Sequence, residues 1–150
     1  MQRWIVMAVV GALLAGAGGG FALWNYRENR PKKVWVPLPL NAALTEEKRE
    51  QLAAEIKAKL LAGTIIADAV EETDFASKMK LTPEQAEAEA RQRLFVELGE
   101  TDTPMGRVPS VNIGFNCQRK SFNAYGSLAT RLMKDVWKML GIKEPEAPLF

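Results

Sequence analysis

The stretch Thr82–Leu98, TPEQAEAEARQRLFVEL, contains both kinds of regular secondary structure and a clear boundary between them. Thr82 is a good N-cap, Pro83 suits the first helical position, and Gln85 completes a capping box with Thr82. The last five letters, LFVEL, are apolar and β-prone, so we expect the helix to end near Arg93. A helix that passes directly into a strand predicts a domain that mixes α and β structure.

The residues before this stretch predict one strand and a pair of helices. Val34–Leu40 (VWVPLPL) is apolar, but Pro37 and Pro39 cannot donate to a β-ladder. This favours a short edge strand that ends at the prolines. The helices are expected from the N-cap Thr45 to Gly63 and from about Thr64 onward, with a connection at residues 78–81.

The residues after it predict a loop, a strand and a long helix. Gly99–Pro109 is polar and contains Gly and Pro, which predicts a loop. Val111–Phe115 alternates apolar and polar residues, as a half-buried strand does. Ser121–Leu140 has the broad apolar face of an amphipathic helix, on which Tyr125 is expected as a core residue, and Gly141 is expected to end the helix.

These elements predict a two-layer α+β domain of about three short strands with helices on one face. We expect three parts: residues 1–30 as a transmembrane anchor with a basic juxtamembrane segment, 31–142 as the α+β domain, and 143–150 as a loose tail.

The anchor is predicted from Trp4–Trp24, WIVMAVVGALLAGAGGGFALW, which contains no charged residue. As a helix it would span roughly 30 Å, the thickness of a bilayer hydrocarbon core. Aromatic rings favour the membrane interface, and basic side chains bind headgroups. The residues expected at the interface are Trp4, Trp24, Tyr26, Arg27, Arg30, Lys32 and Lys33.

Small residues repeat every four positions along this segment, as in helices that pack closely together in lipid. The packing residues predicted on this basis are Gly11, Ala12, Ala15, Gly16, Gly19 and Gly20. The alternative is the Gly- and Ala-rich composition common in bacterial membrane helices. A cleaved signal peptide is the rival for the whole segment, since Ala15-Gly16-Ala17 resembles a cleavage site. Apolar character continues to Trp24, which favours an uncleaved anchor.

From about residue 34 to residue 142 the layout resembles the N-terminal domain of the Wzz family of polysaccharide chain-length determinants. That family places a membrane helix before a short strand, here VWVPL. A helix pair follows (LLAGTIIADAVEET), then a capped helix running into a strand (LTPEQAEAEARQRLFVEL). A strand and a long amphipathic helix close the domain (SVNIGFNCQRKSFNAYGSLATRLMKDVWKML).

The resemblance implies a periplasmic domain anchored in the inner membrane, and ring-like homo-oligomers acting in surface-polysaccharide assembly. Family members usually start the last helix with Asp-Pro, where this chain has Arg119-Lys120. They also have a long helical extension and a second membrane helix, whereas this sequence stops at Phe150. Basic residues after the membrane segment favour a cytoplasmic domain by the positive-inside rule, so charge and resemblance disagree on orientation.

The residue types present argue against most catalytic chemistry. The chain has no histidine, a single cysteine and a net charge of +2, so there is no case for nucleic-acid binding or a cysteine metal cluster. Cys117 has Arg119 and Lys120 nearby, which would lower its pKa, but an incidental thiol is the favoured interpretation. We expect no catalytic residue, cofactor or metal.

Three polar clusters are weighed against ordinary surface charge, which is favoured for each. The two acidic clusters, as possible cation sites, are Asp68, Glu71, Glu72 and Asp74, all expected late in the second predicted helix, and Glu97, Glu100 and Asp102. The basic cluster, as a contact for an acidic glycan or headgroup, is Gln118, Arg119 and Lys120 with Arg91 and Arg93.

The expected function is a non-enzymatic, membrane-anchored scaffold in surface-polysaccharide biosynthesis or export, with partners among its own copies and membrane-complex subunits. Two alternatives stay open: an accessory subunit of another membrane complex, and a periplasmic binding domain released by signal cleavage.

Overall fold

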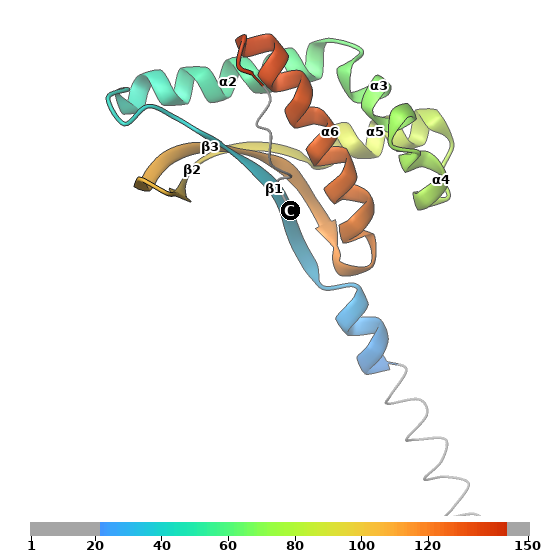
Figure 1. The fold of residues 1–150 in the computed structure, drawn as a ribbon. Helices are drawn as coiled ribbons and strands as arrows, with labels where there is room; N and C mark the ends of the chain where they lie inside the picture. Colours follow the sequence, from blue (N-terminus) through green and yellow to red (C-terminus); the bar gives the residue numbers. More distant parts are fainter. Residues whose placement is uncertain (1–21, 144–150) are drawn as a thin grey trace, which may run out of the picture.

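The computed structural model describes residues 22–143 and shows an α+β domain with helices packed on a three-stranded antiparallel sheet (Figure 1). Residues 22–28 are helical and lead into the domain. The elements are β1 (Pro31–Pro39), α2 (Glu46–Ala62), α3 (Ile65–Glu72), α4 (Phe75–Met79), α5 (Pro83–Arg93), β2 (Leu94–Thr103), β3 (Gly106–Gln118), η1 (Arg119–Ser121) and α6 (Phe122–Leu140). The sheet order is β1-β3-β2, which confirms the predicted fold class and number of strands.

The predicted membrane helix, Trp4–Trp24, falls almost entirely on residues 1–21, outside the described residues. This holds for Trp4 and for every small residue of the predicted packing ridge, and residues 144–150 of the predicted tail are also outside. Within residues 22–143, no helix combines the length and the apolar character needed to cross a bilayer. Trp24 and Tyr26 are described, and both side chains are well exposed.

Helix α5 confirms the strongest local prediction. The Gln85 backbone N–H donates to the Thr82 hydroxyl (3.3 Å), and the Thr82 N–H donates to the Gln85 side-chain oxygen (3.2 Å). Two orphan donors at the helix start are thereby satisfied. Ala86 and Ala90 are fully buried, and the helix ends at Arg93 as expected.

The predicted end of β1 at its prolines is wrong, because the strand continues through Pro37 to Pro39. The Leu40 N–H donates to the Pro109 carbonyl (2.8 Å), and the Arg30 carbonyl accepts from the Arg119 N–H (3.1 Å). In β1, the N–H and C=O groups of even-numbered residues therefore face β3, and those of odd-numbered residues face away from it. Pro37 and Pro39 face the open edge, where a missing N–H costs no ladder bond.

The predicted loop at Gly99–Pro109 is also wrong. β2 and β3 extend into a hairpin that closes at the pair Thr103 and Gly106. Pro109 is tolerated because its backbone groups face β1. The ladder between β3 and β2 therefore needs no N–H donor at this position. Gly106 has φ +114°, a conformation that favours glycine.

The segment between α3 and α5 contains a short helix, α4, that the sequence analysis did not predict. Asp74 and Lys80, with φ of 54° and 56°, bracket this helix in left-handed conformations. Phe75 is fully buried, and its ring lies 4.9 Å from that of Tyr125. Burial of the Phe75 ring stabilises this short helix, although no glycine or proline in the sequence marks the interruption between α3 and α4.

The main hydrophobic core lies on one face of the sheet. In β1, Val34, Val36 and Leu38 are buried under the helices, whereas Lys33 and Trp35 point to the open face. Pairing brings these buried side chains into line with Phe115, Ile113 and Val111 of β3. The core cluster joins them to apolar residues of α2, α3, α5 and α6, which confirms the two-layer arrangement.

Candidate functional site

Positive side chains from three separate parts of the chain meet where β1 and β2 begin and β3 ends; we call this region the basic end. It contains Lys32, Lys33, Arg93, Arg119 and Lys120. Antiparallel pairing places Pro31 opposite Gln118 and Lys32 opposite Cys117, so residues from opposite ends of the domain sequence become neighbours. In Figure 1 the helical residues 22–28 lead into the sheet at this same end.

The positive side chains of the basic end differ in whether they form an ion pair. Lys33 Nζ lies 3.0 Å from a carboxylate oxygen of Glu97 and 4.8 Å from the centre of the Phe95 ring. Lys32 Nζ lies 5.3 Å from the centre of the Phe122 ring. Arg119 and Lys120 are exposed and form no side-chain ion pair with any of residues 22–143. Of these four solvent-facing cations, Lys33 alone is neutralised within the described part of the chain.

Arg91, predicted as part of the same cluster, belongs elsewhere. Its guanidinium donates to the Gly63 carbonyl (3.0 Å) and pairs with Glu87 (2.7 Å). The contact to Gly63, together with one to the Leu61 carbonyl, joins the end of α2 to α5, while Glu87 lies one turn away on α5 itself. Arg91 is therefore a structural residue, and the other residues of the predicted cluster lie at the basic end.

Of the other predicted interface residues, Arg27 is exposed on residues 22–28. Arg30 is exposed too, and its guanidinium carbon lies 5.2 Å from the centre of the Tyr26 ring. Trp24, Tyr26, Arg27 and Arg30 thus form an exposed aromatic and basic segment directly before the basic end.

Two hollows flank Arg93. The larger, about 550 Å³, lies between α5, η1 and the start of α6. The smaller, about 340 Å³, lies against the start of β1 and includes Lys32, Lys33 and Asn116. Arg93 and Gln118 line both hollows, so the two are adjacent. The Arg93 Nε is 2.5 Å from a Glu89 carboxylate oxygen, which holds the guanidinium in place.

Tyr125 lies at the inner side of the larger hollow. It is 1% exposed, and no acceptor among residues 22–143 takes its hydroxyl proton. Burial raises the pKa of Tyr125 to about 12, against the opposing positive charge of Arg93. A guanidinium can only donate, so Arg93 offers the phenol proton no acceptor. The hydroxyl is therefore a neutral donor that lacks an acceptor in the described part of the chain.

Cys117 is buried, and burial raises the pKa of its thiol. The expected lowering by Arg119 and Lys120 is wrong: the positive charges that oppose the shift are those of Arg93 and Lys32, and burial outweighs them. A raised pKa disfavours the thiolate that a nucleophilic cysteine needs.

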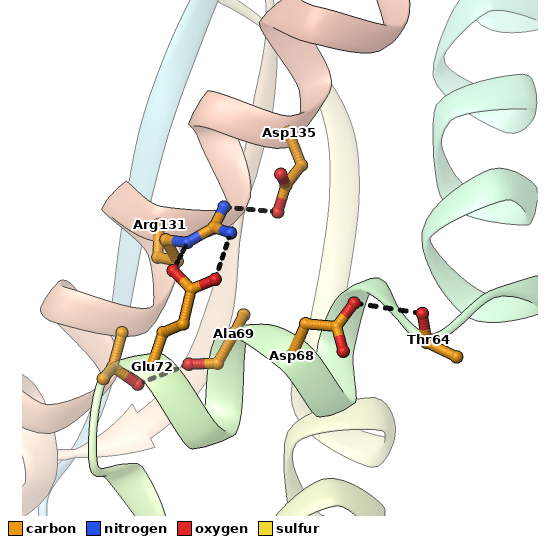
Figure 2. Close-up of polar contacts among 7 residues, drawn as sticks. Thr64, Asp68, Ala69, Glu72, Arg131 and Asp135 are labelled. Atoms are coloured by element: carbon orange, nitrogen blue, oxygen red, sulfur yellow. Dashed lines mark hydrogen bonds and ion pairs between the residues drawn. The ribbon is translucent and has the colours of Figure 1, made fainter.

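Two acids of the first acidic cluster, Asp68 and Glu72, make structural contacts, as Figure 2 shows. Glu72 pairs with Arg131 of α6 through both carboxylate oxygens, the second at 2.8 Å, and its hydrogen bond to Arg131 lowers the pKa of Glu72. Arg131 also contacts Asp135 at 2.6 Å. Asp68 accepts from the Thr64 hydroxyl at 3.0 Å. Asp74 is outside α3, so the predicted placement of all four acids in one helix is wrong.

The second acidic cluster lies along the hairpin. Glu97 pairs with Lys33, while Glu100 and Asp102 lie 3.5 Å and 3.4 Å from Arg107. Across residues 22–143, no group of three or more Asp, Glu or Cys side chains has the arrangement of a metal site. Neither acidic cluster gathers into a cation site in this part of the chain.

Comparison with protein-family models, curated proteins and solved structures finds no match to this chain.

Proposed function

We propose that this chain is a non-enzymatic, membrane-anchored scaffold protein that acts in surface-polysaccharide biosynthesis or export, with its basic end against the membrane. The observation that carries the proposal is the position of the basic end. Lys32, Lys33, Arg119 and Lys120 gather where residues 22–28 enter the domain, next to the predicted membrane helix.

Electrostatics favours this placement. A basic side chain near an anionic leaflet contributes about 1 kcal/mol of attraction, and several together would orient a small domain. The exposed rings of Trp24 and Tyr26 lie on the segment that leads to the same end, and such rings favour the headgroup region. The predicted membrane helix and the basic end would thus both hold this side of the domain against the bilayer.

The scaffold role rests on the resemblance to the Wzz-type domain and on the small-residue ridge. The order of strands and helices supports the resemblance, since a capped helix runs into β2 and a long amphipathic α6 closes the domain. The ridge at Ala12, Gly16 and Gly20 would let copies of the membrane helix pack together. Partners would be further copies and subunits of a polysaccharide machine.

Purification of the tagged full-length chain in mild detergent, with native mass measurement and identification of co-purified proteins, tests assembly. We expect a homo-oligomer together with envelope proteins such as glycosyltransferases or a polymerase. Gly16→Leu with Gly20→Leu should reduce oligomer size, whereas the control pair Val9→Leu and Leu13→Ile should not. A monomer without membrane partners, or a mature chain beginning near Gly18, would overturn the proposal.

Hydrogen exchange of the full-length chain in nanodiscs tests the orientation of the domain. With phosphatidylglycerol in the bilayer, amides at Gln118–Ser121 should exchange more slowly than in pure phosphatidylcholine. Lys32→Glu with Lys120→Glu should abolish the difference, and Lys57→Glu with Lys59→Glu on α2 should preserve it. Equal exchange in the two bilayers contradicts membrane contact at the basic end. A C-terminal alkaline phosphatase fusion reports separately whether the domain is exported.

A further inference from the structure

The larger hollow at the basic end has the features of a small-molecule binding pocket. Its volume, about 550 Å³, falls in the range of small-molecule pockets. One wall is the face of α5 that carries Gln85, Glu89 and Gln92, and η1 and α6 form the other. Met79, Leu81 and Ala88 contribute apolar surface between these polar groups.

The phenol of Tyr125 is the strongest pointer to a ligand. Its ring is held between those of Phe75, at 4.9 Å, and Phe115, at 5.4 Å. The hydroxyl is buried with no acceptor among the described residues, and the nearby charges of Arg93 and Glu89 line the hollow. Buried polar groups are nearly always hydrogen-bonded, so this rigid donor calls for an acceptor from outside the domain.

The charges in the hollow favour an anion. Glu89 and Arg93 neutralise each other through their 2.5 Å contact. Lys120 is exposed at the rim and pairs with no carboxylate of residues 22–143, which leaves one positive charge.

The amides in the hollow favour hydroxyl groups. The Gln85 side-chain oxygen is occupied by the Thr82 N–H, so its NH2 group is available to donate. Gln92 is exposed on the same helix face, and its side chain makes no hydrogen bond to the described part of the chain. Amide groups bind hydroxyls well because each both donates and accepts.

We propose that this hollow binds a small hydroxylated ligand that carries one oxyanion, a phosphate or a carboxylate on a sugar. Lys120 holds the oxyanion, and the Tyr125 hydroxyl donates to an oxygen of the ligand. Gln85 and Gln92 bind its hydroxyl groups, and the Glu89–Arg93 pair forms a neutral wall. The site goes beyond the scaffold role and does not depend on it.

Titration calorimetry on the full-length chain in detergent tests the site with three probes: glucose 6-phosphate, glucuronate and uncharged glucose. We expect at least one anionic probe to bind roughly tenfold more tightly than glucose, which is the effect of one charged contact. Binding of the phosphate alone, or of the carboxylate alone, identifies which oxyanion the site takes.

Variants assign the binding to this hollow. Lys120→Gln should remove the preference for the anionic probe, and Tyr125→Phe should weaken its binding roughly five- to tenfold, as expected for one lost hydrogen bond. The matched controls are Lys57→Gln on α2 and Tyr26→Phe on the exposed N-terminal segment. Gln92→Ala, at an exposed position, serves as a second test should Tyr125→Phe fail to fold.

The proposal is overturned if neither anionic probe binds, if glucose binds as tightly as they do, or if the controls weaken binding as much as the pocket variants.

Discussion

The two ends of the sheet differ in how they are attached to the rest of the domain. At the basic end α5 runs directly into β2, and β3 continues through η1 into α6; Cys117 and Tyr125 are buried there. At the hairpin end β1 stops at Pro39, opposite Ser110, while β2 and β3 continue to the pair Thr103 and Gly106.

Burial and charge follow this difference. At the hairpin end Met105 is 98% exposed, and Arg107 pairs with Glu100 and Asp102 on the surface. Surface pairs of this kind contribute little to stability. The basic end combines solvent-facing positive charge with the buried residues Cys117 and Tyr125, and a binding surface needs both charge and a rigid support. The hairpin end has charged side chains but lacks such buried residues beneath them in the described structure.

A substitution in the middle of the sheet should destroy both ends, with the largest expected effect. A Cβ at Gly114 would lie 2.0 Å from the Val34 carbonyl oxygen and 2.6 Å from the Trp35 Cα. Because both contacts are backbone atoms of β1, the central strand cannot relax around them. Gly114→Ala should cost more than about 4 kcal/mol and prevent folding, as judged by circular dichroism and urea unfolding.

The matched control for Gly114→Ala is Gly126→Ala in α6, where the nearest atom to a new Cβ is 3.9 Å away. This variant should gain about 0.5–1 kcal/mol from helix propensity. A folded Gly114→Ala protein of normal stability would contradict the close approach of β1 to β3.

Strong alkali should destabilise the domain through ionisation of Tyr125. The pKa of Tyr125 rises from 10.0 to about 12, so the folded state holds the phenol proton more tightly than the unfolded state does. Its contribution is complete below pH 10 and is lost as the pH rises from about 10 to 12. Urea unfolding across this range should show the loss, and Tyr125→Phe should remove that part of the slope while Tyr26→Phe keeps it.

The hairpin end should respond to its turn glycine by a smaller amount. Gly106 has φ +114°, and a Cβ added there would meet nothing within 4 Å, so only backbone strain is at issue. Gly106→Ala should cost about 1–2 kcal/mol in urea unfolding. The neighbouring variant Met105→Ala should change stability by less than about 0.5 kcal/mol. Equal effects of the two substitutions would contradict the turn geometry.

The smallest expected effect is chemical and leaves stability unchanged. Iodoacetamide should label Cys117 only after unfolding, since the residue is 3% exposed and burial raises the pKa of its thiol. Hydrogen peroxide should oxidise Met105 in the folded protein, because that side chain is open to solvent. Rapid labelling of native Cys117, followed by mass spectrometry, would show that the basic end opens.

Local signals in the sequence predicted much of the fold. The capping box at Thr82 and Gln85, the end of α5 at Arg93 and the stop of α6 at Gly141 all depend on residues within a few positions of each other. Helix termini are governed by such short-range hydrogen bonds, so they can be predicted without knowledge of the rest of the chain. The fold class follows from the order of these segments.

Tertiary structure decided what depends on strand pairing. Pro37 and Pro39 disfavour strands locally, yet they are tolerated because their nitrogens face the open edge of β1. The backbone groups of Pro109 face β1 where that strand ends, so the ladder between β3 and β2 is intact. The basic end could not be predicted as one site, because the register of β1 against β3 brings Lys32 beside Cys117 and the residues that follow it.

The candidate binding site depends on tertiary packing in the same way. Tyr125 was expected in the core, and only the packing of Phe75 and Phe115 around its ring leaves the hydroxyl without an acceptor among the described residues. Such contacts join residues far apart in the chain, and they arise from burial of one shared apolar face rather than from any local pattern.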